Sequence, residues 1–272
     1  ARPAAAHAGG AGHDPAAEVA VPLGLGLAGA GIALVLTRMR RAQSRHRRPG
    51  RHIRLPDPDT AAIETGLRAG DHTEDALIWL DRVLRHAGAH LAATNEPGRL
   101  RGVVVNPERA ELIWDRTIPP PADAEGLGDR WVVRRDGDVF AARAGTEVSV
   151  APALASLGLD DDGAEVLINL EMFAPLDVRG EPAAVAATIA SLCAGLGGAP
   201  WADGVEVITL GGLHELAGLD RVVAGDDTTL KVVEARVAEA AAAAEDLGLD
   251  IHAARLRSPA GPWAPTVVAS PV

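Results

Sequence analysis

Tyrosine is missing from this sequence, and three other residue types are scarce. Among the 272 residues there are two phenylalanines, one cysteine and one lysine. A single cysteine excludes an internal disulfide and any metal site built from several cysteines. Cys193 falls in an apolar stretch, so we interpret it as a small buried hydrophobe rather than a reactive thiol. Because aromatic residues are rare, Ala, Val and Leu must fill most of the core, and 47% of the residues are hydrophobic.

Charge is distributed unevenly along the chain. The net charge is −11, but residues 38–54 contain eight arginines and no acidic residue. Residues 1–37 carry −1, which leaves −18 for residues 55–272. A body this acidic is poorly suited to neutralising the phosphates of DNA or RNA, so the sequence argues against nucleic acid as a partner. The first residue is Ala rather than Met, and we interpret the chain as a piece of a longer protein.

Residues 19–36 form the longest uncharged stretch near the N-terminus. As a helix they would span about 27 Å, which is enough for the hydrocarbon core of a bilayer. A signal peptide would have its basic residues before this stretch, whereas here they follow it. A buried core helix would not normally carry four glycines and then a run of arginines. We therefore predict a single transmembrane helix at 19–37, preceded by a disordered extracytoplasmic tail at 1–18.

The arginines that follow predict the orientation of this helix. By the positive-inside rule they place the N-terminus outside and the remaining chain in the cytoplasm, so the predicted location is the cell membrane, with a single pass. Residues 38–57 form a basic juxtamembrane linker for which contact with anionic lipid is the preferred interpretation over nucleic-acid binding. The membrane-orienting residues are Arg38, Arg40, Arg41, Arg45, Arg47 and Arg48.

Residues 58–150 predict a small α+β region. Apolar residues recur every three or four positions between Glu74 and Ala93, which indicates a helix with one buried stripe. After Pro97 the period changes to two, and short strands are expected at 100–105, 110–114, 131–134 and 139–142. His86 and His90 lie four residues apart, but no further ligands accompany them, so we predict neither a metal site nor a catalytic site here.

Residues 151–272 predict a three-layer α/β domain with a mainly parallel sheet. Strands at 166–171 and 205–210 flank an apolar helix at 183–196, which is the pattern of a βαβ unit. A long Ala-rich helix is expected at 229–247 and a last strand within 263–271. The acidic run at 160–162 is interpreted as a hairpin turn because it lacks the spacing of a calcium loop.

This order resembles the FtsK/SpoIIIE family of P-loop motor ATPases. If Gly180 stands for the first glycine of the phosphate loop, the second glycine, the lysine and the hydroxyl residue fall on Val185, Ala186 and Ala187. The Walker B acids would fall on Ser270 and Pro271. The resemblance therefore implies a degenerate P-loop domain without catalytic residues, metal or cofactor. A residual nucleotide site would consist of Arg179, Gly180, Glu181, Pro182 and Ala183.

A narrower resemblance is to actinobacterial membrane proteins that join an extracytoplasmic LysM part to a C-terminal bacterial transcriptional-activator domain. It rests on four segments, at 167–171, 176–182, 200–203 and 215–222. Neither flanking domain is present in these residues. The resemblance implies a membrane-anchored regulator or sensor.

The expected function is that of a non-enzymatic, membrane-anchored regulatory or assembly module, which the narrower resemblance implies is part of a signalling or transcription-regulating protein. Its partners would be membrane lipid and either another protein or a second copy bound through the α/β domain. Two alternatives stay open. One is a nucleotide-binding protein or ATPase that holds phosphate on the backbone amides after Gly180. The other is a relative of DNA-translocating motors.

Overall fold

A computed structural model of the chain describes residues 72–94, 98–136, 148–211, 213, 216 and 219–270. The predicted extracytoplasmic tail, transmembrane helix and arginine-rich linker, including Arg38, Arg40, Arg41, Arg45, Arg47 and Arg48, lie outside these residues, as does the strand expected at 139–142. Among the described helices, none combines the length and the apolar character needed to cross a bilayer.

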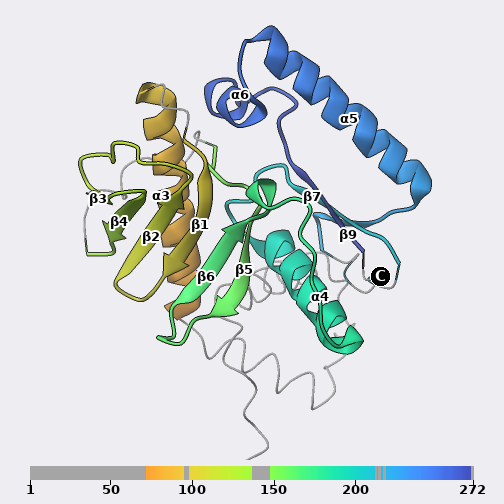
Figure 1. Cartoon of the computed structure of the whole chain (residues 1–272), viewed down its shortest axis with the longest axis horizontal. Coiled ribbons are helices and arrows are strands. Elements are labelled where there is room, and N and C mark those ends of the chain that lie inside the picture. The colour runs from red at the N-terminus through yellow and green to blue at the C-terminus, as the bar shows by residue number, and fades with distance from the viewer. Residues whose placement is uncertain are drawn as a thin grey trace, which may run out of the picture.

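The first half of the described chain is an antiparallel sheet covered by one helix (Figure 1). Six strands pair in the order β3-β4-β2-β1-β6-β5, and each neighbouring pair is antiparallel. Helix α3 supplies a buried stripe that includes Leu77, Leu80, Leu84 and Leu91, which confirms the stripe expected from the sequence. The elements are α3 (His72–Thr94), β1 (Leu100–Val105), β2 (Arg109–Trp114), β3 (Glu125–Leu127), β4 (Arg130–Arg134), β5 (Leu154–Leu159) and β6 (Glu165–Asn169).

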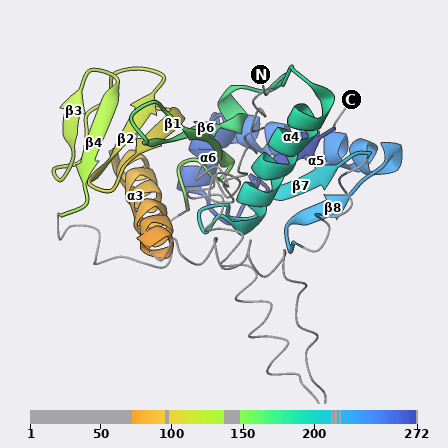
Figure 2. The same ribbon diagram turned by 90° about the horizontal axis from the view of Figure 1, so that it is seen from below.

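The second half is built around a small parallel sheet in the order β8-β7-β9. Val207 of the central strand belongs to the same buried cluster as Leu192 and Leu196 of α4, whereas Glu206 forms an ion pair with Arg236 of α5. Because successive side chains of a strand point to opposite faces, α4 and α5 lie on opposite sides of this sheet (Figure 2). The elements are η2 (Leu170–Met172), α4 (Pro182–Gly198), β7 (Glu206–Thr209), β8 (Val222–Ala224), α5 (Asp227–Asp246), α6 (Ile251–Arg257) and β9 (Thr266–Ala269).

The predicted fold class, a three-layer domain with a mainly parallel, P-loop-like sheet, is wrong. Strand β6 pairs antiparallel with β1 and β5, whereas β7 belongs to the other sheet, so α4 connects two sheets and does not complete a βαβ unit. An apolar run such as 166–170 indicates a buried strand but does not specify its neighbours. The hairpin turn after β5, where Asp160 Oδ1 accepts hydrogen bonds from the amides of Asp162 and Ala164, sets the antiparallel pairing.

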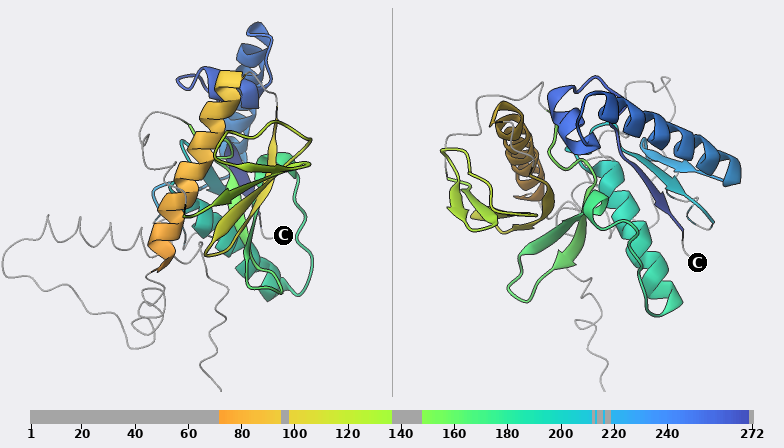
Figure 3. Two further views of the ribbon diagram at one scale, coloured as in Figure 1. Left: turned by 90° about the vertical axis from the view of Figure 1, so that its left-hand side faces the viewer. Right: turned by 45° about the horizontal axis from the view of Figure 1, so that its top comes forward.

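The two sheets share one core. A single cluster of buried residues extends from α3 and β1 through β6 to α4, β7 and β8. Trp201, after α4, donates from its indole nitrogen to the carbonyl of Leu154 in β5 at 2.9 Å. Arg85 of α3 bridges to Asp203 at 2.7 Å. These contacts hold the segment between α4 and β7 against β5 and α3. The right-hand view of Figure 3 shows α4 beside the strands β5 and β6.

Candidate functional site

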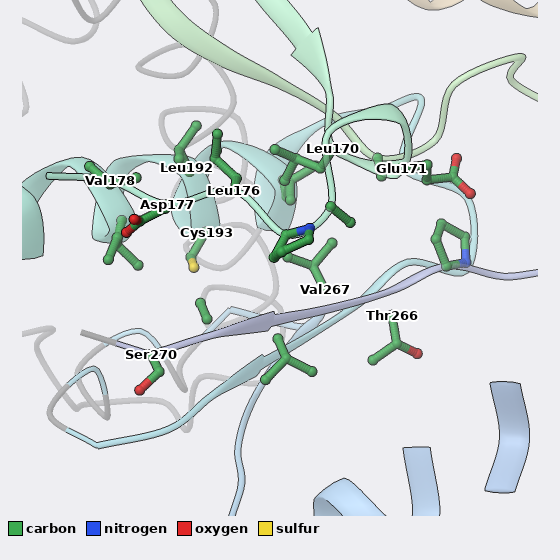
Figure 4. A pocket seen from close by; sticks show the side chains of 18 of the residues that line it. Leu170, Glu171, Leu176, Asp177, Val178, Leu192, Cys193, Thr266, Val267 and Ser270 are labelled. Carbon is green, nitrogen blue, oxygen red and sulfur yellow. The ribbon is translucent and has the colours of Figure 1, made fainter. Parts of the chain in front are cut away.

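A pocket of about 530 Å³ opens between the two sheets. Figure 4 shows its three walls, which come from the segment after β6, from α4 and from β9. The segment after β6 contributes Leu170 of η2 and then Leu176 and Val178, while β9 and its flanks contribute residues 265–270. The position of the pocket follows from the chain path, because the segment from η2 to α4 has to pass from one sheet to the other.

The α4 wall of the pocket is apolar. Ile189, Leu192, Cys193 and Leu196 line it, and their spacing places them on one face of the helix. Cys193 is 2% exposed, and burial raises the pKa of its thiol to about 11. The thiol therefore stays protonated at neutral pH and serves as a small apolar group, because the thiolate is the reactive form.

The two carboxylates at the pocket are engaged by arginines. Glu171 receives two hydrogen bonds from Arg255, at 2.9 and 2.5 Å. Asp177 receives one from Arg179 at 2.6 Å, and both of these side chains are exposed. Histidine does not occur among the described residues that line the pocket. The lining thus offers apolar contact and backbone groups rather than a paired acid and base.

Strand β9 forms the edge of its sheet at the pocket. It pairs with β7 on one side, and within the described residues no strand pairs with its other side. Residues 265–270, which include the whole strand, line the pocket, so the free edge of the strand is part of the wall. An unpaired edge presents N–H and C=O groups that can pair with another chain.

Helix α4 is unusual because it carries no charged side chain and yet is half exposed. No charged residue occurs between Glu181 and Asp203, and the helix lies within this stretch. Its buried residues are all in the C-terminal half, whereas the first four residues, 182–185, are exposed or only partly buried. A helix of this composition is normally covered all round, so its N-terminal half lacks the cover that its sequence suits.

The turn predicted to hold phosphate lies at the exposed start of α4. Arg179, Gly180, Glu181, Pro182 and Ala183 are consecutive and exposed. The carboxylate of Glu181 caps the helix by accepting a hydrogen bond from the Ala184 amide at 3.1 Å. An acidic group therefore already occupies the position at which the helix amides could receive an anion.

The other residues discussed in the sequence analysis lie in different parts of the structure. Val185 and Ser270, which stand at the positions of a phosphate-loop glycine and a Walker B acid in the resemblance, line the pocket. Pro271 lies outside the described residues. The ring nitrogen Nε2 of His86 lies 3.3 Å from Asp123, and that of His90 lies 3.1 Å from the carbonyl of Pro119, so these two histidines turn to different partners.

Sequence reasoning missed the pocket residues Val178, Ile189 and Val268. One signal was available, namely the 21 uncharged residues at 182–202, which are longer than a single buried helix face requires. The contribution of β9 had no comparable signal, because a strand edge is defined only by the neighbours that the fold supplies.

The resemblances to the motor ATPases and to the membrane regulators stay expectations from the sequence. Comparison with models of known protein families, with curated proteins and with solved structures gave no match to this chain.

Proposed function

We propose that the described part of the chain is a non-enzymatic assembly module that binds a protein partner at the pocket and at the exposed half of α4. The observation that carries this proposal is the exposure of a helix without any charged residue. In keeping with the sequence, we place the module on the cytoplasmic side of a membrane, anchored by residues 19–37 and serving regulation or assembly.

The energetic argument concerns apolar side chains that remain in water around the pocket. Leu176 is 44% exposed on the wall after β6. Val268 of β9 is 43% exposed, but it pairs with Ile208, so its side chain points to the same face of the sheet as Glu206, away from α4. Burying a fully exposed Leu side chain contributes about 1.5–3 kcal/mol, so covering the part of Leu176 that is still exposed would contribute about 1 kcal/mol. A partner that covers both walls and the start of α4 would therefore gain most from apolar contact, which is typical of the centre of a protein interface.

The chemistry of the lining favours binding over catalysis. The Cys193 thiol is held protonated by burial, and the carboxylates of Glu171 and Asp177 are paired with arginines.

Nucleotide binding at the 179–183 turn is disfavoured because the Glu181 carboxylate would repel a phosphate group. In calorimetric titrations of the full chain with ATP or GTP and Mg²⁺, we expect no binding at an affinity of about 100 μM or tighter.

Site-specific photocrosslinking in the native cells tests the proposal. A photoreactive amino acid replaces Leu176 at the pocket in one variant and Leu127 of β3, which is 54% exposed, in the control. We expect a discrete adduct from position 176 that is lost when Ile189→Glu places a charge in the pocket. Equal adducts from both positions, or none from 176, would contradict the proposal. Sedimentation of the purified chain then shows whether the adduct is a second copy.

A further inference from the structure

We infer that the partner enters the pocket as an extended peptide segment that adds to the free edge of β9 as a new strand, and that basic residues flank its apolar centre. This inference rests on the proposed function and specifies the class of ligand. It requires that the edge of β9 has free backbone groups, that the facing wall contributes backbone groups, and that the charge near the pocket suits a basic ligand.

The backbone of β9 alternates between its two sides. Glu206 donates its amide to the carbonyl of Pro265 at 3.2 Å, and Leu210 donates to that of Ala269 at 2.8 Å. Residues 265 and 269 therefore face β7. Because a strand alternates with a period of two, the N–H and C=O groups of Thr266 and Val268 face away from β7, toward the pocket. Two residues thus supply four pairing groups for an added strand.

The facing wall contributes backbone groups that pair with no other backbone group in the described residues. Residues 176–179 contain neither helix nor strand, and no backbone hydrogen bond joins them to any other described residue. Their amides and carbonyls are consequently available beside the pocket. In Figure 4 the chain that carries Leu176 and Asp177 passes on the far side of the pocket from β9. An inserted segment would meet unpaired backbone groups on both of its edges.

The side chains of an inserted strand would alternate between two surroundings. One set would point to the α4 wall, where Ile189, Leu192 and Leu196 offer an apolar surface. The other set would point to the opposite face of the sheet, which is the side of α5. We therefore expect apolar residues at alternate positions of the ligand, which is the usual pattern of recognition by strand addition, where backbone bonds give affinity and pockets give specificity.

The charge near the pocket favours basic residues at the two ends of the ligand. Two acidic residues line the pocket, Glu171 and Asp177, and each is paired with an arginine, which leaves the Glu181 carboxylate at the nearby start of α4 as the excess charge. Asp177 is 66% exposed, and Glu181 at the start of α4 is also exposed. A ligand with arginine or lysine beside its apolar centre would be attracted here, and an acidic one would be repelled. The same charge disfavours a second copy of this part of the chain as the occupant.

The probe is a fluorescent peptide, Arg-Arg-Val-Thr-Val-Thr-Val-Arg-Arg, titrated with the full chain in non-ionic detergent and followed by fluorescence anisotropy. We expect saturable binding, and at least tenfold weaker binding when glutamates replace the four arginines. Val268→Pro removes an N–H from the free edge only, a position where proline is compatible with a strand, and should weaken binding at least tenfold. Val268→Ala keeps the N–H and should weaken it less than threefold.

A second measurement leaves the protein unchanged. N-methylation of alternate peptide amides, in two registers, blocks one edge of the peptide at a time, and we expect at least one register to lose binding tenfold or more. Binding that tolerates both Val268→Pro and both methylated peptides, yet is lost with Ile189→Glu, would overturn strand addition while leaving the pocket as a protein-binding site. Absence of binding by the unmodified probe would overturn the inference and leave the crosslinking experiment to decide on the pocket itself.

Discussion

At the scale of single residues, one ion pair links two segments that border the pocket. The guanidinium of Arg255 is 7% exposed and the carboxylate of Glu171 is 13% exposed. Arg255 also donates from Nε to the carbonyl of Trp263 at 3.0 Å. These bonds tie α6 and the approach to β9 to the segment after β6. Removing one member would leave the other charge buried and unpaired, which costs more than the pair itself contributes.

We expect Arg255→Met to lower the free energy of unfolding by about 3 kcal/mol in urea denaturation. The double variant Arg255→Met/Glu171→Leu should recover most of this loss, because it removes both charges. Arg179→Ala is the matched control: its ion pair with Asp177 is solvent-exposed, so its effect should stay within about 0.5 kcal/mol. Equal losses in Arg255→Met and Arg179→Ala would show that burial does not govern these pairs.

The imidazole of His252, in α6, makes the stability of the folded protein depend on pH. Burial lowers the pKa of His252 from its ordinary value. The negative charges of Glu171 and Asp250 act to raise this pKa, and the positive charges of Arg255 and Arg99 act to lower it. The folded protein thus favours the neutral ring. The unfolded chain takes up the proton first as the pH falls, so the stability contributed by His252 is complete above about pH 6.5 and is lost below it.

Urea denaturation between pH 7.5 and 5.5 tests this dependence. We expect the free energy of unfolding of the wild type to decrease as the pH falls below about 6.5, and this decrease to be smaller in His252→Asn, which has no titrating ring. The same slope in both proteins would contradict the assignment of this pH dependence to His252.

At the scale of elements, helix α3 is held against the segment that leads into β5. A Cβ atom added at Gly88 would lie 2.6 Å from the backbone carbonyl oxygen of Val148 and 3.3 Å from Leu256. Replacing glycine by alanine inside a helix usually stabilises it by about 0.5–1 kcal/mol. At Gly88 the added methyl group would clash with a backbone atom, which cannot rotate away. Alanine should therefore destabilise the fold at this position.

Thermal and urea denaturation of Gly88→Ala should therefore show a loss of about 1–3 kcal/mol, the usual range for overpacking. Ala89→Gly, at the neighbouring partly buried position, is the control and should lose only about 0.5–1 kcal/mol through helix propensity. A gain in stability for Gly88→Ala would mean that the close approach of α3 to Val148 is incorrect.

The elements also show how far the sequence is informative. The stripe of α3, the hairpin turn at Asp160 and the long helix α5 were predicted, because each is encoded by residues close together in the chain. The partners of β6 were not, because Val103 and Leu167 become neighbours only through the fold. The same limit applied to the pocket: Ile189 is readable as an apolar helix residue, but the free edge of β9 opposite it is not.

At the scale of the whole molecule, one core supports two sheets, and the pocket lies where the chain passes between them. The expectation of a protein partner stays a prediction, whereas the P-loop architecture from which it was derived does not hold. The apolar surface of α4 now supports the same expectation independently. The sequence alone shows that α4 has no charged residue, whereas only the folded structure shows that the helix is partly exposed.

Residue-resolved amide hydrogen exchange by NMR, with and without the arginine-flanked peptide, tests strand addition most directly. In the free chain the amides of Thr266 and Val268 should exchange faster than those of Val267 and Ala269, which face β7. At saturating peptide we expect the exchange of Thr266 and Val268 to slow at least tenfold. If the peptide binds and these two amides keep their exchange rates, the ligand does not pair with β9 and the inference is wrong.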